Sequence, residues 1–282
     1  MAGLSLRVLV DNSTLIDRYF LGEPGFSCYL ACGKKKILFD TGYSGAFLAN
    51  AGKMGIDLLD LDTVVLSHGH NDHTGGLPFL MNAHLEAAIG KRPHRQPAIV
   101  AHPHCFYPRP ARDAGNIGCP LDPERIRCGA MVTTTTKPVW LTDTLVFLGE
   151  IPRHSDVIPD RGKRRTILMP GGPEPDHLLD DSALAYVSDA GLVIVTGCAH
   201  AGILNVIDCA REVTGADTVR DIIGGFHLKA SDRAAIDATV AGLKEIRPAA
   251  LHPCHCTSLA AKIALAAVAP VGEVGVGLLL EY

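Results

Sequence analysis

The sequence contains no pair of cysteines spaced C-x-x-C, although nine cysteines are scattered along its 282 residues. An odd number without paired spacing argues against a disulfide framework and against a zinc site built from cysteine pairs. The first residues also lack the basic start, the long apolar run and the small-residue cleavage site that are typical of an export signal. We therefore expect free thiols and a cytoplasmic location.

Long apolar runs and a strong charge of one sign are missing as well. No uninterrupted apolar segment approaches the roughly 18–20 residues needed to cross a bilayer, so we expect no membrane-spanning segment. The net charge is −4, which gives no electrostatic reason to expect nucleic acid as a partner. Hydrophobic residues make up 47% and charged residues 20% of the chain, a composition that favours a compact globule. These features leave the oligomeric state open.

One short stretch concentrates side chains that bind metals. The apolar run Val64 to Leu66 predicts a buried strand, because it is short and bounded by serine and glycine. Three histidines and an aspartate follow within six positions, from His68 to His73. Imidazole and carboxylate groups at this density suit zinc, with iron or manganese as alternatives. The stretch therefore predicts a metal site on the loop after the strand.

The pattern His68-x-His70-x-Asp72-His73 resembles the signature of the metallo-β-lactamase superfamily. This resemblance implies a four-layer αββα sandwich with two divalent metal ions, most simply zinc, along one edge of its two sheets. It further implies that His68 and His70 bind the first metal, and that Asp72 and His73 bind the second.

Further histidines follow apolar strands in the second half of the chain. His200 comes shortly after the run Gly191 to Thr196, and we expect it to be the third imidazole of the first metal. His227 follows a strand end without the bridging aspartate that the resemblance implies, so it is expected to bind the second metal or to contact substrate. His255 is preferred over His252 as the last ligand of the second metal.

Other residues near these motifs have two interpretations each. Asp40 ends a strand and is expected to orient a ligand histidine from behind, the alternative being a plain turn. Asn12 either reaches the site or caps a turn. Cys198 is interpreted as a small buried hydrophobic residue in preference to a ligand or a nucleophile. His84 is expected to be structural, and we do not expect His102 or His104 to be ligands.

The domain organisation follows from these patterns. The chain is predicted to be a single domain, residues 1–282, with residues 90–130 as a cap or lid, because the proline-rich stretch 102–127 has no clear periodicity. A strand is expected over 272–280. Basic residues occur at Lys91 and Arg92 and in the run 161–165, and they provide a possible surface for phosphate.

Motifs along the whole chain, from Gly25-Phe26-Ser27 to His255-Cys256-Thr257, are similar to a branch of the superfamily typified by the archaeal dihydropterin synthase of methanopterin biosynthesis. This resemblance implies an anionic small-molecule substrate with a phosphate or pyrophosphate group. In a pyrophosphate-releasing transferase, the metals and Arg153 or the basic loops would hold the pyrophosphate.

A metallohydrolase is the alternative. In that enzyme a metal-bound hydroxide would attack a phosphodiester, lactone or thioester, and Asp72 would hold or accept the proton. Two other classes have less support. One is a diiron redox domain of the flavodiiron type, which typically has a glutamate where this chain has His70, and the other is a non-catalytic metal-binding or structural protein.

Overall fold

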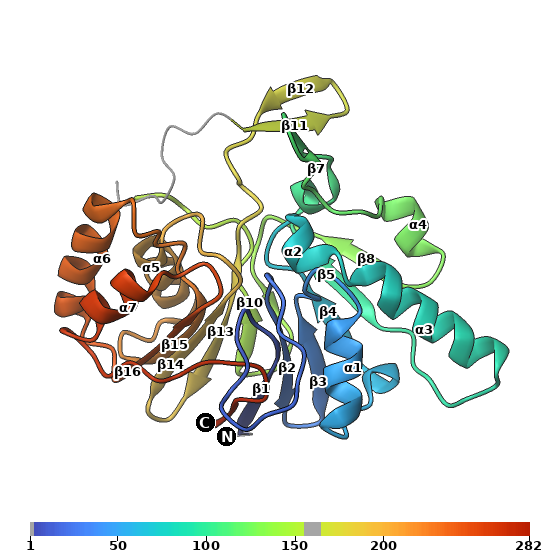
Figure 1. Cartoon of the computed structure of the whole chain (residues 1–282), viewed down its shortest axis with the longest axis horizontal. Helices are drawn as coiled ribbons and strands as arrows, with labels where there is room; N and C mark the ends of the chain where they lie inside the picture. Colours follow the sequence, from blue (N-terminus) through green and yellow to red (C-terminus); the bar gives the residue numbers. More distant parts are fainter. Residues whose placement is uncertain (1–2, 155–164) are drawn as a thin grey trace.

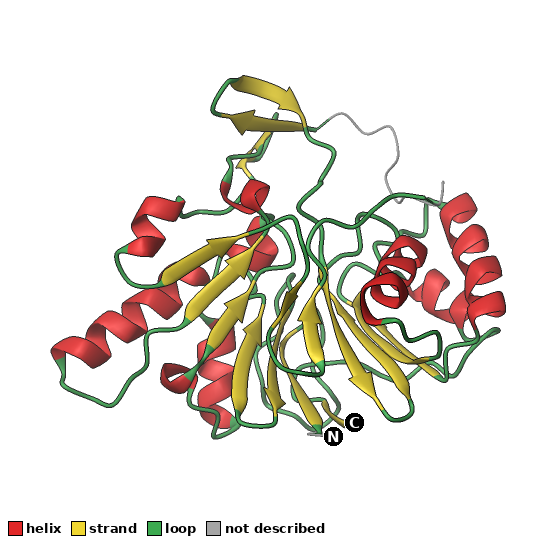
Figure 2. Ribbon diagram, turned by 180° about the vertical axis from the view of Figure 1, so that it is seen from behind, coloured by secondary structure: helices red, strands yellow, loops and turns green. Residues whose placement is uncertain are grey.

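The computed structural model describes residues 3–154 and 165–282, and two β-sheets packed face to face form its centre. In Figure 1 the helices α5, α6 and α7 cover the outer face of one sheet, and α1 and α3 cover the outer face of the other. Figure 2 shows the same layers from behind, with the strands of the two sheets between two groups of helices. The chain is a four-layer αββα sandwich, as the sequence predicts.

The first sheet has seven strands in the order β17-β1-β2-β3-β4-β5-β8. Its strands are β1 Leu4–Val10, β2 Ser27–Cys32, β3 Lys35–Phe39, β4 Thr63–Val65, β5 Ala98–Ala101, β8 Met131–Thr134 and β17 Leu279–Glu281. The strands from β17 to β3 are antiparallel neighbours, whereas β3, β4, β5 and β8 run parallel. The hairpin predicted around residues 25–40 is present as β2 and β3.

The second sheet has six strands in the order β16-β15-β14-β13-β10-β9. Its strands are β9 Val139–Trp140, β10 Leu145–Phe147, β13 Ala183–Ser188, β14 Gly191–Thr196, β15 Val219–Gly225 and β16 Ala250–Cys254. The strands β14, β15 and β16 are parallel to one another. Because the carboxyl ends of parallel strands meet at one edge, the residues that follow these three strands are brought together.

The helices pack their apolar sides on the two sheets. They are α1 Ala46–Lys53, α2 Asn71–Thr74, α3 Leu77–Ile89, α4 Pro123–Arg127, α5 Ile203–Thr214, α6 Arg233–Ile246 and α7 Leu259–Leu265, with the 3-10 turns η1 Leu58–Asp60 and η2 Pro103–Phe106. The sequence locates α6 and α7 well because the side chains of Asp232 and Ser258 cap their first turns, each accepting a backbone N–H. None of the helices formed by the described residues has the length and apolar character needed to cross a bilayer.

Three apolar clusters fill the spaces between the layers. The central cluster lies between the sheets and includes Phe26, Phe39 and Phe147, all fully buried. The other two clusters lie beneath α5–α7 and beneath α1 and α3. Alternate residues of β1 contribute to the central cluster, because successive side chains of a strand point to opposite faces. The buried sheets form a rigid frame for the loops at the strand ends.

Two expectations about local structure need correction. The strand expected over 272–280 is reduced to β17, because the preceding residues turn away to bond with the segment after β1: Val276 donates its backbone N–H to Ser13 at 2.9 Å. The stretch 102–127 is more regular than its composition suggests. It contains η2, α4 and a small hairpin of β6 Pro110–Ala111 and β7 Gly115–Asn116, which faces a second hairpin of β11 Thr166–Met169 and β12 Gly172–Pro175.

Candidate metal centre

The predicted ligands come together at the edge of the sandwich where four strands end. His68 follows β4, His200 follows β14, His227 follows β15 and His255 follows β16. The short helix α2, which carries Asp72 and His73, lies at the same edge between the two sheets in Figure 1. Residues that are far apart in the sequence are therefore neighbours here because of the sheet topology.

The backbone at these strand ends adopts an unusual conformation. Asp40, Ala199, His227 and His255 all have a positive φ, between 49° and 56°, although none of them is glycine. Such left-handed residues are uncommon and cost free energy, and they are concentrated where the surrounding structure holds a functional geometry. Within the described part of the chain, four of the eight non-glycine residues with positive φ thus lie at this one edge, which marks it as the candidate functional site.

The first set of donors is made of three imidazoles. Donor atoms of His68, His70 and His200 all lie within 4.8 Å of one another, and His68 Nε2 is 2.9 Å from His70 Nδ1. His200 is only 3% exposed, and neither of its ring nitrogens has a hydrogen-bond partner; the same is true of His70 Nε2. Buried polar atoms are rarely left without a partner, so these nitrogens fit a bound cation. This is the trio that the sequence analysis expects for the first metal.

The second set contains one carboxylate and two imidazoles. His255 Nε2 lies 3.4 Å from Asp72 Oδ2 and 3.3 Å from His73 Nε2, and the three residues present their donor atoms within 4.8 Å of one another. His252 points elsewhere and pairs with Asp221 at 2.8 Å. The geometry therefore favours His255 over His252, the preference that the sequence suggested.

A layer of hydrogen bonds holds the donors from behind. Asp40 Oδ2 lies 2.7 Å from His73 Nδ1 and accepts the Ser67 hydroxyl proton at 2.7 Å, and Ser67 Oγ is 2.9 Å from His68 Nδ1. Asp40 thus contacts His73 of the second set directly and reaches His68 of the first set through Ser67, in the orienting position predicted for it. Asn12 is on the other side, where its Nδ2 donates to the backbone carbonyl of His255 at 3.1 Å.

A buried ion-pair network supports the metal loop, and the sequence analysis did not anticipate it. Arg109 is 1% exposed and pairs with Asp176 at 2.9 Å and with Asp180 at 2.7 Å. Asp180 also accepts the backbone N–H of Gly69 at 2.8 Å, between His68 and His70. The proline-rich stretch supplies Arg109, so it braces the loop that carries the first donors. The sequence of this stretch does not indicate such a role, because an isolated arginine in a proline-rich segment is usually an exposed surface residue.

The two sets differ in their electrostatics. Burial, followed by neighbouring imidazoles or Arg109, lowers the pKa of His68 and His200 well below the usual value and lowers the pKa of His70 to about 3. Burial also acts to lower the pKa of His73, but the carboxylates of Asp72 and Asp40 outweigh it and raise that pKa to about 9. The first set therefore presents neutral imidazoles that are ready to bind a cation. In the second set, a protonated His73 supplies positive charge beside the carboxylates of Asp72 and Asp40.

Two further side chains lie at the junction of the sets. The ring of His227 is 4.2 Å from that of His200, so His227 lies beside the first set, whereas the sequence analysis expected it at the second metal or against substrate. Cys198 Sγ lies 3.2 Å from His73 Nε2. The sequence interpretation of Cys198 as a hydrophobic residue rests on its small size and expected burial. Its position two residues before His200 is the feature of the sequence that indicates a place at the site.

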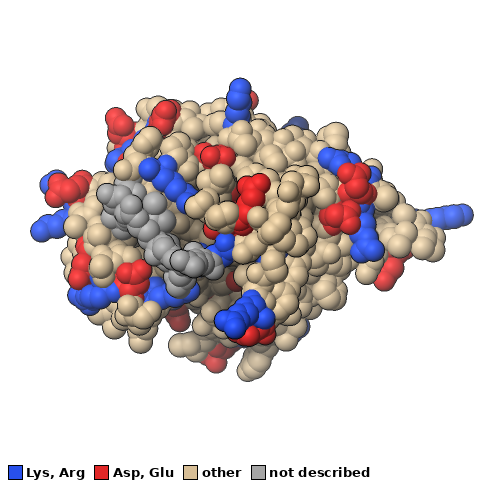
Figure 3. Space-filling model, turned by 90° about the horizontal axis from the view of Figure 1, so that it is seen from above, with Lys and Arg blue, Asp and Glu red and all other residues tan. Residues whose placement is uncertain are grey.

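A cleft of about 630 Å³ opens above both sets. Tyr43, which is 55% exposed, and Ile117 contribute to its walls, and Arg165 supplies a guanidinium group. Among the described residues on the face shown in Figure 3, basic and acidic side chains are intermixed. Among the described residues that line the cleft, Arg165 is the one arginine or lysine.

The other basic residues named from the sequence are placed differently. Arg153 donates from Nη2 to the carbonyl of Leu178 at 2.7 Å and does not line the cleft. Lys91 and Arg92 are exposed in the connection between α3 and β5. Arg161, Lys163 and Arg164 lie outside the described residues. Contact between Arg153 and a substrate stays a prediction from the sequence.

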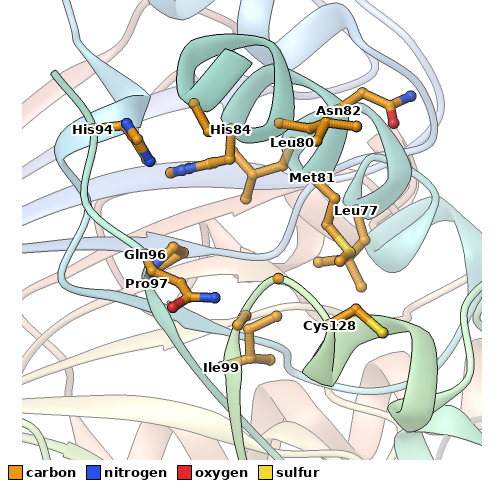
Figure 4. A pocket seen from close by; sticks show the side chains of 14 residues that line it. Leu77, Leu80, Met81, Asn82, His84, His94, Gln96, Pro97, Ile99 and Cys128 are labelled. Carbon is orange, nitrogen blue, oxygen red and sulfur yellow. The ribbon is translucent and has the colours of Figure 1, made fainter. Parts of the chain in front are cut away.

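A second cavity, of about 440 Å³, lies beside α3 and the start of β5. Figure 4 shows His84 and His94 next to each other at one end, with their ring centroids 6.4 Å apart, and Leu80, Met81 and Ile99 among the apolar walls. Within the described residues, neither histidine belongs to a group of three metal-binding side chains. The structural role expected for His84 stays a prediction from the sequence.

Comparison with known proteins identifies the class. The family model of the metallo-beta-lactamase superfamily matches residues 23–200, and the chain belongs to this superfamily. Among curated proteins, the chain is similar to the 7,8-dihydropterin-6-methyl-4-(beta-D-ribofuranosyl)-aminobenzene-5'-phosphate synthase of Methanocaldococcus jannaschii, with 32% identity over 239 residues that cover 81% of this chain and 78% of the relative. An uncharacterized protein of the same archaeon is 26% identical over 91% of both chains.

Solved structures support the same class. The chain resembles a metal-dependent hydrolase of the beta-lactamase superfamily with a TM-score of 0.82 and 26% identity, over 99% of both chains. The metallo-beta-lactamase fold protein YhfI from Bacillus subtilis shares the fold with a TM-score of 0.60 at 14% identity. The match to the first of these structures includes both sheets and the proline-rich stretch, so this metal-dependent hydrolase shares the whole architecture of the chain.

Proposed function

We propose that this chain is an enzyme that uses two divalent metal ions, most simply zinc, to act on an anionic small molecule with a phosphate or pyrophosphate group. His68, His70 and His200 would hold the first ion, and Asp72, His73 and His255 would hold the second. The observation that carries the proposal is that both sets of donors lie side by side, with buried unpaired imidazole nitrogens, beneath a cleft that Arg165 lines. The cleft volume is in the range usual for small-molecule sites, roughly 300–1,000 Å³.

The residues around the donors have distinct tasks in this proposal. Bound divalent ions would supply the positive charge that stabilises the oxygens of a departing pyrophosphate. Arg165 would bind the phosphate group, because a guanidinium matches phosphate oxygens in charge and geometry. Asp72 would bind the second ion as a carboxylate that can accept a proton during turnover, and His227 would contact the substrate. Asp40 and Ser67 keep the rings of His73 and His68 in fixed orientations.

A pyrophosphate-releasing transfer is the first candidate reaction. Its support is the relative that is 32% identical and is named as a synthase whose product contains a dihydropterin and a ribofuranosyl-aminobenzene phosphate. Tyr43 offers an exposed aromatic ring at the wall of the cleft, and such a ring stacks well on a planar heterocycle. We infer a substrate that combines an aromatic ring with a phosphate group.

Hydrolysis of a phosphodiester, lactone or thioester is the second candidate. The observation in its favour is the solved relative described as a metal-dependent hydrolase, which matches 99% of the chain. In this reaction Asp72 would accept the proton from the attacking water. Both candidates use the same donors but differ in the bond that breaks and in the acceptor, which is the aromatic partner in the transfer and water in the hydrolysis.

We also propose that residues 1–282 form one domain in which residues 90–130 cap the cleft. Ile117 lines the cleft, and its carbonyl accepts the backbone N–H of Asn71 at 2.8 Å. Arg109 ties the same stretch to Asp176 and Asp180. These contacts favour a fixed wall in preference to a mobile lid.

The test is an assay of pyrophosphate release from a 7,8-dihydropterin that carries a methyl pyrophosphate, with and without a ribofuranosyl-aminobenzene phosphate as acceptor. A transferase releases pyrophosphate only with the acceptor, and a hydrolase acting on this compound releases it without. A panel of phosphodiesters, lactones and thioesters covers the other hydrolytic reactions. His68→Ala and His200→Ala should abolish turnover, and the exposed His94→Ala should not. Unchanged turnover in the first two variants would remove the proposed mechanism.

A further inference from the structure

Cys198 occupies an unusual place for a small apolar side chain. It follows β14 by two residues, is 3% exposed, and its Sγ lies 3.2 Å from His73 Nε2. Its sulfur also takes part in three groups of potential metal donors, each with all donor atoms within 4.8 Å of one another. These groups are Cys198 with His68 and His73, Cys198 with His200 and His227, and Cys198 with His255 and Cys256. One sulfur atom is thus close to donors of both sets.

The backbone around Cys198 is shaped to bring it there. A side chain at Gly197 would overlap Ser67 Oγ and come within 2.8 Å of Asp40 Oδ2. A side chain at Gly225 would meet the Cα of Cys198 at 3.3 Å. Gly197, after β14, therefore approaches Ser67 and Asp40, and Gly225, at the end of β15, approaches Cys198 and Cys256, more closely than any other residue type permits. Ala199, with its positive φ of 49°, then turns the chain so that the side chains of Cys198 and His200 both lie among the metal donors.

The charges of the two sets leave room for another anionic donor. Two divalent ions would bring four positive charges, and within the described residues Asp72 is the only carboxylate in any of the donor groups. The first set consists of neutral imidazoles alone. A thiolate is anionic, and zinc binds sulfur and nitrogen donors readily. Coordination to a cation also deprotonates a thiol outright, so the burial of Cys198 is no obstacle.

We propose that Cys198 is a metal ligand of this centre, and that its thiolate, lying between the two sets of donors, supplies the second anionic donor besides Asp72. This inference rests on the proposed metal-dependent function. On binding, the Sγ–H proton leaves to solvent and a sulfur lone pair forms the bond to the cation. Cys256 is a neighbouring thiol in the third of these groups, and its Sγ accepts the backbone N–H of His227 at 3.2 Å.

The first experiment is a titration of metal-depleted protein with Co²⁺, followed by absorption spectroscopy. Visible d–d bands report binding at the centre, and a near-ultraviolet sulfur-to-cobalt charge-transfer band reports a thiolate ligand. The wild-type protein should show both signals. Cys198→Ala and Cys198→Ser should lose the charge-transfer band while keeping visible bands. Cys256→Ala and Cys209→Ala, which remove a neighbouring sulfur and a remote buried one, should keep the charge-transfer band.

The outcomes separate the two proposals. Visible bands without a charge-transfer band in the wild-type protein overturn the role of Cys198 and leave the metal centre standing. A charge-transfer band that survives in Cys198→Ala, or disappears in Cys256→Ala alone, also overturns it. The absence of any cobalt signal refutes the metal centre itself. Should the Cys198 variants fail to fold, X-ray absorption of the zinc-loaded wild-type protein decides, because a sulfur ligand appears at about 2.3 Å and a spectrum with nitrogen and oxygen neighbours only contradicts the proposal.

Discussion

The metal-free protein should lose stability in mild acid because of the three histidines of the first set. His68 and His200 are buried, and the pKa values of all three rings lie well below the ordinary value, with His70 at about 3. The folded protein therefore binds no proton at these rings at pH 5.5. The unfolded chain does, because its histidines titrate near pH 6.5. The unfolded state then binds more protons, so the free energy of unfolding must fall as the pH is lowered.

The size of the effect follows from this difference in proton binding. Between pH 6.5 and 5.5 each histidine lowers the free energy of unfolding by about 1 kcal/mol, so the three together lower it by about 3 kcal/mol. His73 acts in the other direction because its pKa is raised to about 9. Its contribution is fully present below pH 6.5 and is lost as the pH rises toward 9, so it offsets little of the acid effect. Burial raises the pKa of Asp181 to about 7, so this carboxyl also opposes the acid effect, by about 1 kcal/mol between pH 6.5 and 5.5.

Urea denaturation of chelator-treated protein at pH 6.5 and 5.5 measures this difference. The variant His200→Asn should reduce the loss by about 1 kcal/mol, since it removes one of the three titrating groups. The exposed His94→Asn is the matched control and should leave the difference unchanged. An equal pH dependence in wild-type protein and in His200→Asn would refute the assignment of the acid effect to the buried imidazoles.

Three further substitutions test the supporting structure. Arg109→Met leaves two buried carboxylates without their partner and should lower the free energy of unfolding by about 3–5 kcal/mol in urea denaturation; a loss below about 1 kcal/mol contradicts the buried network. Gly197→Ala should cost about 1–3 kcal/mol by overpacking, whereas Gly52→Ala, where a Cβ meets open space, should be neutral or slightly stabilising in the same assay. Arg165→Ala should raise KM for a phosphate-bearing substrate roughly tenfold with unchanged metal content, because a hydrogen bond to a charged group contributes about 1.5–3 kcal/mol. The exposed Arg125→Ala is the control and should leave KM unaltered. Equal KM values for both variants would exclude phosphate binding by Arg165.

Comparison of the sequence with the structure shows which features are local. The segment from His68 to His73 could be recognised because its donors are consecutive and follow an apolar strand. His200 and His255 carry the same local signature, a histidine a few residues after a buried strand. The bounds of helix α3 are also local features, since Pro78 lies in its first turn and Gly90 follows its last residue. The expected strand over 272–280 was wrong because distant contacts with Ser13 replace strand pairing there.

What the sequence by itself determined is the set of histidines and the superfamily, because both are read from short spacings along the chain. Only the tertiary structure decided how these residues are grouped. The parallel order of β14, β15 and β16 places His227 beside His200, and the close packing at Gly197 brings Cys198 to His73. It also decided that Arg109 is buried behind the metal loop. Such contacts join residues as far apart in the sequence as His73 and Cys198, which are separated by 125 positions, and strand pairing, not local sequence, determines which of them meet.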